Sequence, residues 1–408
     1  MNVYISGISG TGMGPLALMA KQAGLNVCGS DMAKGAIYDE LVAMGVEVKI
    51  GPQDGEYLRK KLTEGIDWFV YTSALPEDHA ELVLAREADI KCTKRDDFTA
   101  YLVDALKLKM VAVAGTHGKT TTTAMIIWTA LKLNLQVAYI VGSTLGFAPS
   151  GAYHAGDKYF VYEADEYDRN FLKYYPWLAV VVAVSYDHPD IYHTKEEYTE
   201  AFEKFRAQSE SVIEGVVSNE GLKLAGAARR ADAALALEAI KKMAPEVTEA
   251  EIVKILNEFP GVGRRFEKIA DGVYTDYAHH PEEIAATIDV AREECELTHK
   301  KGAVVVYQPH QNTRQHEVRD GYKEAFVGAD RVYWLPTYLT REDENLPVLT
   351  PEELIAGLVN SDVAEATVLN DELEKNLRKY INDGYMVLMM TAGPADAWLR
   401  EKFGNKRS

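Results

Sequence analysis

A lysine and four successive threonines follow a glycine in the stretch Ala114-Gly-Thr-His-Gly-Lys-Thr-Thr-Thr-Thr123. An apolar run, Met110–Ala114, precedes this stretch, and an apolar-periodic segment from Thr121 to about Leu133 follows it. A strand, a glycine turn and a helix in this order can cradle phosphate, because backbone N–H groups and the positive end of the helix both face the turn. We expect Lys119 to reach the β- and γ-phosphates of a nucleotide and the Thr120 hydroxyl to bind Mg²⁺.

The spacing departs from the strict phosphate-loop pattern, because Val113 stands at the position of the first glycine and Gly115 is the first glycine here. A glycine turn that merely joins a strand to a helix is the alternative, but it leaves the lysine and the threonines unexplained. We therefore predict an ATP-binding loop made of Gly115, Thr116, His117, Gly118, Lys119, Thr120 and Thr121.

A second glycine-rich turn, Gly7 to Gly14, follows the expected first strand, Val3–Ser6, and Asp31 ends the expected second strand. This is the layout of a dinucleotide-type fold. The spacing G-x-x-G-x-G-x-G differs from G-x-G-x-x-G, so NAD(P) binding does not follow from it. A diphosphate anchored on the loop is the broader inference, and a tight turn without a ligand is the alternative.

Carboxylates follow two expected strands of the part that holds the lysine loop. Glu163–Asp168 comes at the end of Tyr159–Glu163, and Asp187–Asp190 follows Ala179–Val184. Ligands gather at the carboxyl ends of parallel strands, and carboxylate oxygens suit Mg²⁺. Each cluster alone fits a solvated turn better, but beside Lys119 the two together favour a second Mg²⁺ site.

Three further polar clusters lie in the last third of the chain: Gly263–Glu267, Asp276–Pro281 and Gln308–Arg314. Arg264 and Arg265 could bind phosphate or form surface ion pairs. Adjacent strand residues point opposite ways, so His279 and His280 are not expected to share a metal, and we expect one of them to cap a helix or to pack.

Strand-like and helix-like segments alternate along the chain, which predicts an α/β fold of three units in series with mainly parallel sheets. We place the units at residues 1–106, 107–260 and 261–408. Two of the less regular strands are expected at Gly215–Ser218 and Ala366–Leu369.

The chain of 408 residues carries 62 acidic and 44 basic side chains, a net charge of −18. This balance argues against nucleic-acid binding, which needs a basic face. Three dispersed cysteines predict neither a disulfide framework nor a thiolate zinc site. No apolar run reaches the length of a membrane span, and we expect a cytoplasmic protein without membrane partners. The sequence leaves a monomer and a homodimer open.

The motifs then occur in the order found in the Mur ligases, a family that the chain resembles over nearly its whole length. They are GISGTGMG (7–14), Ser30-Asp31, Thr72-Ser73-Ala74, AGTHGKTTTT (114–123), EADEYDRNFL (163–172), DHPDIY (187–192), GVGRRFE (261–267), DYAHHPEE (276–283) and QPHQNTR (308–314).

The resemblance implies an N-terminal Rossmann-like domain for a UDP-sugar, a central ATPase and a C-terminal Rossmann-like domain for an amino acid. It implies catalytic roles for Lys119, Glu163, His188, Arg265 and Asp276, with metal ligands at Thr120, Glu163 and His188 and two Mg²⁺ ions beside ATP. The UDP-sugar would contact Gly7, Gly10, Thr11, Gly12, Met13, Asp31 and Ser73. His310 and Arg314 would hold the carboxylate of the incoming amino acid.

The implied reaction adds L-alanine to the lactyl carboxylate of UDP-N-acetylmuramate through an acyl phosphate, as a step of peptidoglycan precursor synthesis. Addition of a preformed peptide to the same acceptor is one alternative. A nucleotide-binding but catalytically weak, regulatory homologue is the other.

Two departures from the family pattern bear on these alternatives. Several tens of residues that are usual before the helix near residue 230 are missing. Ala228, Arg229 and Asp232 stand roughly where the family has a His-Asn pair and a second Asn. In addition, Gln311 replaces an arginine of the alanine-adding pattern, and Asn312-Thr313 is similar to the peptide-adding branch.

Overall fold

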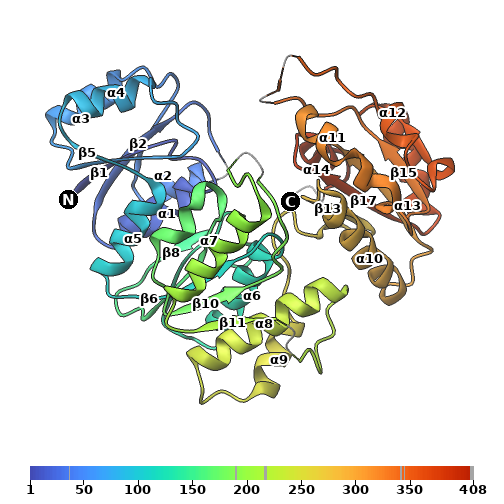
Figure 1. Ribbon diagram of the computed structural model, residues 1–408, viewed down its shortest axis with the longest axis horizontal. Coiled ribbons are helices and arrows are strands. Elements are labelled where there is room, and N and C mark those ends of the chain that lie inside the picture. The colour runs from blue at the N-terminus through green and yellow to red at the C-terminus, as the bar shows by residue number, and fades with distance from the viewer. Residues whose placement is uncertain (36, 189–190, 216–217, 341, 344, 405–408) are drawn as a thin grey trace. The chain divides into compact units, whose positions relative to one another are not determined.

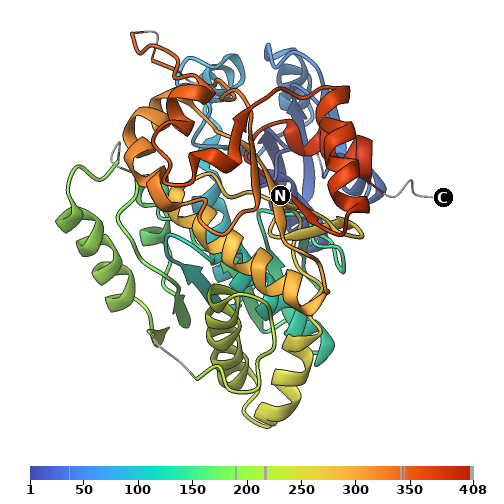
Figure 2. The ribbon, with the colours of Figure 1, turned by 90° about the vertical axis from the view of Figure 1, so that its right-hand side faces the viewer.

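The structure is a computed structural model, and it describes residues 1–35, 37–188, 191–215, 218–340, 342–343 and 345–404. Strands and helices alternate along it and build three sheets in chain order, coloured from blue through green to red (Figures 1 and 2). The chain divides into two compact units, Met1–Leu222 with Ala231–Pro260 and Lys223–Arg230 with Gly261–Ser408. The first two sheets belong to the first unit, and the third sheet belongs to the second.

The first sheet has five parallel strands in the order β3-β2-β1-β4-β5. Its chain order reverses between β1 and β4, so the loops after these two strands leave the sheet side by side, the usual place for a ligand. The strands are β1 (Asn2–Ser6), β2 (Asn26–Asp31), β3 (Glu47–Ile50), β4 (Trp68–Tyr71) and β5 (Lys91–Lys94); the helices are α1 (Met13–Gln22), α2 (Tyr38–Ala43), α3 (Glu56–Thr63), α4 (Ala80–Glu87) and α5 (Arg95–Ala105).

The second sheet runs β11-β10-β6-β9-β7-β8 and is parallel except for β8. Because β6 lies between β9 and β10, the loops after these three strands meet at one edge. The strands are β6 (Lys109–Ala114), β7 (Val137–Ile140), β8 (Gly151–Ala152), β9 (Tyr159–Glu163), β10 (Leu178–Val181) and β11 (Val212–Glu214); the helices are α6 (Lys119–Lys132), η1 (Tyr167–Lys173), α7 (Lys195–Ala207), α8 (Ala227–Met243) and α9 (Glu249–Asn257).

The third sheet runs β12-β13-β17-β14-β15-β16, and only its edge strand β12 is antiparallel. Its strands are β12 (Glu267–Ala270), β13 (Val273–Asp276), β14 (Ala303–Gln308), β15 (Arg331–Trp334), β16 (Ala364–Ala366) and β17 (Met386–Thr391). Its helices are α10 (Pro281–Leu297), α11 (Asn312–Val318), η2 (Arg319–Glu324), α12 (Pro351–Ile355), η3 (Ser361–Val363), α13 (Asp371–Asn382) and α14 (Ala395–Phe403). Buried β14 and β17 form its centre.

Two expected strands are displaced in the structure. The strand expected at 215–218 is β11, which ends at Glu214, because Gly215 adopts a φ of +84° that leaves the extended region. Residues 216 and 217 of that prediction lie outside the described part. The strand expected at 366–369 is β16, which ends at Ala366, and Val368 beyond it is 51% exposed. No helix among the described residues is long and apolar enough to span a bilayer.

Within the first unit, the first two sheets are joined by close contacts. Asp96 at the start of α5 is buried and accepts hydrogen bonds from the Tyr162 and Tyr174 hydroxyls at 2.9 and 2.8 Å. A Cβ atom at Gly151 in β8 would lie 2.4 Å from the carbonyl oxygen of Pro15 in α1. Backbone packed this closely against backbone fixes the position of one sheet on the other.

Gly151→Ala is expected to destabilise this junction, because neither backbone can yield to the added methyl group. Overpacking of this kind costs about 1–3 kcal/mol, which should lower the thermal midpoint by roughly 2–10 °C in differential scanning calorimetry. Gly146→Ala is the matched control, because a Cβ atom there meets nothing within 4 Å. Equal midpoints for the two variants would contradict the prediction.

Candidate active site

The loop between β6 and α6 needs glycine at two positions. Gly115 has a φ of +144° and Gly118 a φ of +86°. A Cβ atom at Gly115 would lie 2.4 Å from a methyl carbon of Val182, which follows β10. The loop therefore keeps its backbone N–H groups at the start of α6 only with glycine at both positions.

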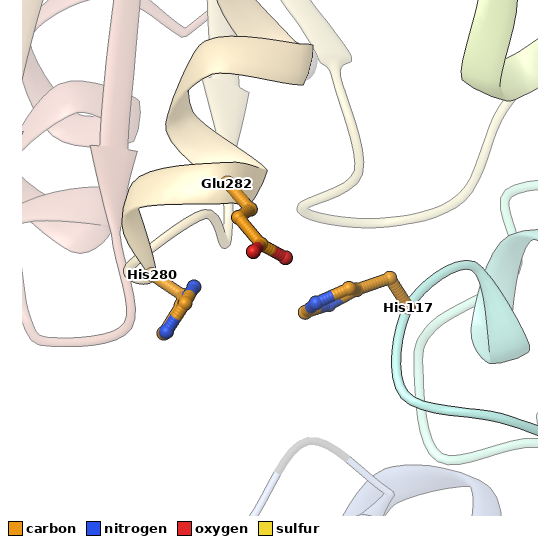
Figure 3. Close-up of side chains that lie close together, drawn as sticks. All are labelled: His117, His280 and Glu282. Carbon is orange, nitrogen blue, oxygen red and sulfur yellow. The ribbon is translucent and has the colours of Figure 1, made fainter. Parts of the chain in front are cut away.

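The loop is held against the segment that leaves β10. The Thr116 N–H donates to the Ala183 carbonyl at 2.8 Å, and the Thr116 hydroxyl donates to the Ser185 carbonyl at 2.6 Å. That hydroxyl is also 2.7 Å from the hydroxyl of Tyr198 in α7. His117 extends from the next position of the loop (Figure 3). The predicted nucleotide loop is thus fixed from outside and does not depend on a ligand for its shape.

Lys119 opens α6 and forms an ion pair with Glu166. Its Nζ lies 2.9 and 2.7 Å from the two carboxylate oxygens and 2.5 Å from the Gly115 carbonyl oxygen. The lysine side chain is 14% exposed and the glutamate side chain 1%. Although burial would lower the pKa of the lysine, the carboxylates of Glu166 and Glu163 hold it above its ordinary value. The ammonium is therefore charged and aimed into the loop.

Thr120 contacts the carboxylate that ends β9. Its hydroxyl lies 3.0 and 3.1 Å from the two oxygens of Glu163. A hydroxyl and a carboxylate side by side at the mouth of a phosphate loop are the oxygen ligands that Mg²⁺ favours. The structure thus brings together two of the three expected metal ligands.

His188, the third expected ligand, lies on the other side of Glu166. Its Nε2 is 3.7 Å from a Glu166 oxygen and 3.7 Å from an Asp187 oxygen. The backbone of His188 has a φ of +57°, and its ring meets the Tyr167 ring edge-on at 5.2 Å. Residues 189 and 190 of the same motif lie outside the described part. The side chain is held between two carboxylates.

Glu166 is the residue of this site to which sequence reasoning gave no role. It contacts both Lys119 and His188, and burial raises the pKa of its carboxyl group despite the opposing attraction of the lysine. The Tyr192 hydroxyl donates to its backbone carbonyl at 2.6 Å. The sequence feature that could have indicated this role is the position of Glu166 in the acidic cluster 163–168, three residues after Glu163.

Only part of the threonine run 120–123 lies at the site, although the sequence suggested a role in phosphate binding for the whole run. Thr122 and Thr123 are fully buried inside α6, so of the four only Thr120 contacts the carboxylate site, and Thr121 is partly exposed. Asp232 of α8 lies against the loop, and its Oδ1 would be 2.4 Å from a Cβ atom at Gly118. The stretch with the weakest match therefore includes a residue at the phosphate loop.

The first glycine loop is held by the end of β2. The N–H groups of Gly7 and Ile8 donate to the Ser30 carbonyl at 2.8 and 3.1 Å, and the Ser9 N–H donates to the Asp31 carboxylate at 2.9 Å. Gly7 has a φ of +75°. Asp31 thus fixes the loop.

Other residues expected to bind the UDP-sugar are differently placed. Thr11 is exposed on the loop, and Ser73 is exposed in the turn after β4. The Met13 side chain is buried in the core, so only its backbone faces the loop. Gly10 closes the turn, with its N–H donating to the Gly7 carbonyl at 3.0 Å.

In the second unit, Asp276 ends β13 with both carboxylate oxygens engaged. They accept from the Phe266 and Ala278 N–H groups at 2.6 and 2.7 Å. Burial raises the pKa of this carboxyl group. Arg264 donates to the Thr391 carbonyl at 2.6 Å and lies over the Tyr277 ring, so its guanidinium is used within the unit. Arg265 lies over the same ring at 5.2 Å, and its charge opposes the raised pKa of Asp276.

The histidines of the second unit have structural positions. His280 is the N-cap residue of α10, with its N–H 3.3 Å from the Glu283 carboxylate, and Glu282 follows in the first turn (Figure 3). His279 Nδ1 lies 3.2 Å from Glu283. The expectation that one of the two caps a helix is confirmed.

The two residues expected to bind an amino acid flank the start of α11. The His310 ring lies 5.7 Å from the Tyr338 ring, and Arg314 lies in the helix, partly exposed.

Ala228 and Arg229, the other two residues at the weak match, belong to the second unit. Ala228 is exposed, and the Arg229 guanidinium is 6.0 Å from the Phe266 ring centre.

Comparison with known families gives three matches in succession. Residues 2–107 match the Mur ligase family catalytic domain, residues 113–232 the Mur ligase middle domain, and residues 264–393 the Mur ligase glutamate ligase domain. The three matches follow the three sheets in order.

The chain is similar over nearly its whole length to a known ligase. It is 30% identical to the UDP-N-acetylmuramate–L-alanine ligase of Syntrophomonas wolfei, over 97% of this chain and 95% of that one. That alignment spans 455 positions against 408 residues here, so the relative carries residues that this chain lacks.

Two solved structures share the fold. The UDP-N-acetylmuramate–alanine ligase of Thermotoga maritima has a TM-score of 0.78 at 24% identity, covering 98% of both chains. The murein peptide ligase of Psychrobacter arcticus has a TM-score of 0.64 at 23% identity, covering 100% of both. The α/β fold of three parts, the resemblance and the ligase class inferred from the sequence are confirmed: the chain belongs to the Mur ligase family.

Proposed function

We propose that this chain is a cytoplasmic, ATP-dependent ligase that joins L-alanine to the lactyl carboxylate of UDP-N-acetylmuramate. The loop after β6 carries the proposal, because it presents Lys119, Thr120 and Glu163 together at the start of a helix. The names and full-length similarity of the relatives support the choice of substrates. Within this proposal, domains 1–106, 107–260 and 261–408 bind the UDP-sugar, ATP and the amino acid.

The residues at this loop fit a nucleotide with Mg²⁺. Thr120 and Glu163 supply neighbouring oxygens, and His188 supplies a ring nitrogen on the far side of Glu166. When bound, one Mg²⁺, or two as we propose, neutralises charge on the phosphates during transfer. Lys119 places a fixed positive charge beside the γ-phosphate.

The reaction then needs little covalent chemistry from the protein. The lactyl carboxylate attacks the γ-phosphorus, the bond to ADP breaks, and an acyl phosphate forms. The amine of alanine attacks the acyl carbon, and the amine loses a proton while phosphate leaves. Lys119 stabilises the charge that develops on the transferred group, and the rest of catalysis is positioning.

The remaining roles complete this proposal. Arg265 and Asp276 take part in catalysis within this proposal, and Asp276 fixes the backbone beside Arg265. His310 and Arg314 hold the amino-acid carboxylate. The loop 7–14 carries the diphosphate of the UDP-sugar, with Asp31 and Ser73 beside it.

Addition of a preformed peptide is the second candidate. Gln311 and the following Asn312-Thr313 favour it, and the murein peptide ligase fold is also similar. A weakly active homologue is the third candidate, favoured by Asp232 in the place of an asparagine beside Gly118.

Phosphate release from ATP is expected to require both UDP-N-acetylmuramate and L-alanine. It is measured with a coupled phosphate assay on the full chain. Lys119→Ala is the blank and should lower kcat at least 100-fold, since it removes charge stabilisation of the transferred group. Equal release without the sugar nucleotide would contradict the proposal.

Replacing alanine with the tripeptide L-Ala-D-Glu-diaminopimelate in the same assay separates the first two candidates. We expect kcat/KM at least 100-fold higher for alanine, because a site that closes around a small amino acid excludes a peptide. A preference for the tripeptide selects the peptide-adding reaction. Binding of ATP and UDP-N-acetylmuramate in calorimetry with no turnover on any acceptor selects the weakly active homologue.

Glu166→Gln is expected to destabilise the nucleotide-free protein, because the buried ammonium of Lys119 loses its counter-charge. Removing one partner of a buried ion pair costs about 3–5 kcal/mol. The thermal midpoint should fall, and ATP with Mg²⁺ should raise it more in the variant than in the wild type, because phosphates replace the missing charge.

Glu214→Gln is the control, because it removes the partner of Arg206 from a solvent-exposed ion pair. Its midpoint should stay within about 1 °C of the wild type, since exposed pairs contribute little. A Glu166→Gln midpoint equal to that of this control would refute a stabilising role for the buried pair.

A further inference from the structure

The guanidinium of Arg95 lies directly against the first glycine loop. A Cβ atom at Gly12 would be 2.6 Å from Nη1 of Arg95 and 3.7 Å from its Cζ. The backbone of Gly12 has φ −93° and ψ −34°, a conformation open to any residue. The shape of the turn does not call for glycine here, and in its place the Arg95 guanidinium occupies the space that a Cβ atom would take.

The position of Arg95 follows from the fold of the first unit. It opens α5, which packs beside α1, and α1 starts at the residue after Gly12 (Figure 1). The cation therefore stands at the positive end of α1, where the first backbone N–H groups of the helix have no partner within the helix. Asp96 faces this guanidinium from one side, and the guanidinium and the helix end together can attract an anion at the loop.

The hydrogen-bonding capacity of this guanidinium is only partly used. Its Nη2 lies 3.2 and 3.4 Å from the Asp96 oxygens, a carboxylate that already accepts from two tyrosines. Its Nε is buried and has no hydrogen-bond partner among the described residues. The side chain is nonetheless 26% exposed. The exposed edge of a guanidinium at the loop is suited to an anionic ligand.

We propose that Arg95 binds the diphosphate of the sugar nucleotide, and that Gly12 is a glycine in order to admit it. This inference rests on the proposed function, because that function places the UDP-sugar on the loop 7–14. Arginine suits the role, since its planar fork can donate two parallel hydrogen bonds to phosphate oxygens.

The test is calorimetric titration of UDP-N-acetylmuramate into the full chain, without ATP. Arg95→Met keeps the length of the side chain and removes its charge, and the dissociation constant should rise by roughly 10- to 100-fold. The dissociation constant of Arg95→Lys should lie between those of the wild type and Arg95→Met, because an ammonium group keeps the charge but cannot donate two parallel hydrogen bonds. Arg86→Met, which removes an exposed ion pair with Glu77 in the same sheet unit, should match the wild type.

Three readouts separate a ligand contact from a fold defect. The affinity for ATP with Mg²⁺ should be unchanged in Arg95→Met. The dissociation constant of UDP-N-acetylglucosamine, which has the diphosphate but no lactyl carboxylate, should rise by the same factor in Arg95→Met. The dissociation constant should also depend less steeply on salt in the variant, since one phosphate contact is gone.

Several outcomes overturn the inference. Arg95→Met binding within twofold of the wild type removes the role altogether, and loss confined to UDP-N-acetylmuramate assigns Arg95 to the carboxylate instead. If the wild-type chain itself binds no UDP-sugar, the proposed function fails first, so the two failures are distinguishable.

The steric half of the inference has its own test. Gly12→Ala should lower the thermal midpoint by several degrees in the wild type and by much less in an Arg95→Ala background, where the guanidinium is absent. Equal losses in both backgrounds would show that Gly12 is needed for another reason.

Discussion

The ion pair between Lys119 and Glu166 is the interaction on which the phosphate loop depends. A lysine held almost out of solvent is stable as a cation only beside a negative charge, and the glutamate is more buried than the lysine. The pair forms because β6 lies between β9 and β10, so that residues after all three strands meet. Glu166 is itself fixed, through its backbone, by Tyr192.

The negative group that pairs with Lys119 can be exchanged when a ligand binds. Within the proposed function, phosphates that bind Lys119 take over the contact that Glu166 makes with it, and the glutamate then keeps His188 as its neighbour. Burial already raises the pKa of Glu166, and without the lysine the protonated carboxyl group is favoured further, because the charge that opposes this shift is gone. The strength of nucleotide binding is thus a difference between two ionic contacts of the same ammonium.

Sequence reasoning predicted those parts of the fold and site that depend on local pattern. The two glycine loops and the polar clusters around Glu163 and His188 could be located because glycine spacing and the ends of strands are visible in the chain, whereas the roles of these two residues were predicted from the family resemblance. Glu166 and Arg95 received no role, because a pairing across 47 residues and a contact over 83 residues depend on strand order. The strand expected at 215–218 was misplaced by a local feature. Apolar residues after Gly215 suggested a strand, but the positive φ of Gly215 ends β11 at Glu214.

In each of the two glycine loops, a charged side chain occupies the space beside a glycine, and the two side chains have opposite charges. At Gly12 a guanidinium fills the space that a Cβ atom would need, and at Gly118 the carboxylate of Asp232 fills it. A cation beside the first loop favours an anion on it. A carboxylate beside the second opposes bare phosphates, although it attracts a metal-bound nucleotide. Within the proposed function, the carboxylate of Asp232 therefore favours the magnesium complex of ATP over free ATP at the second loop.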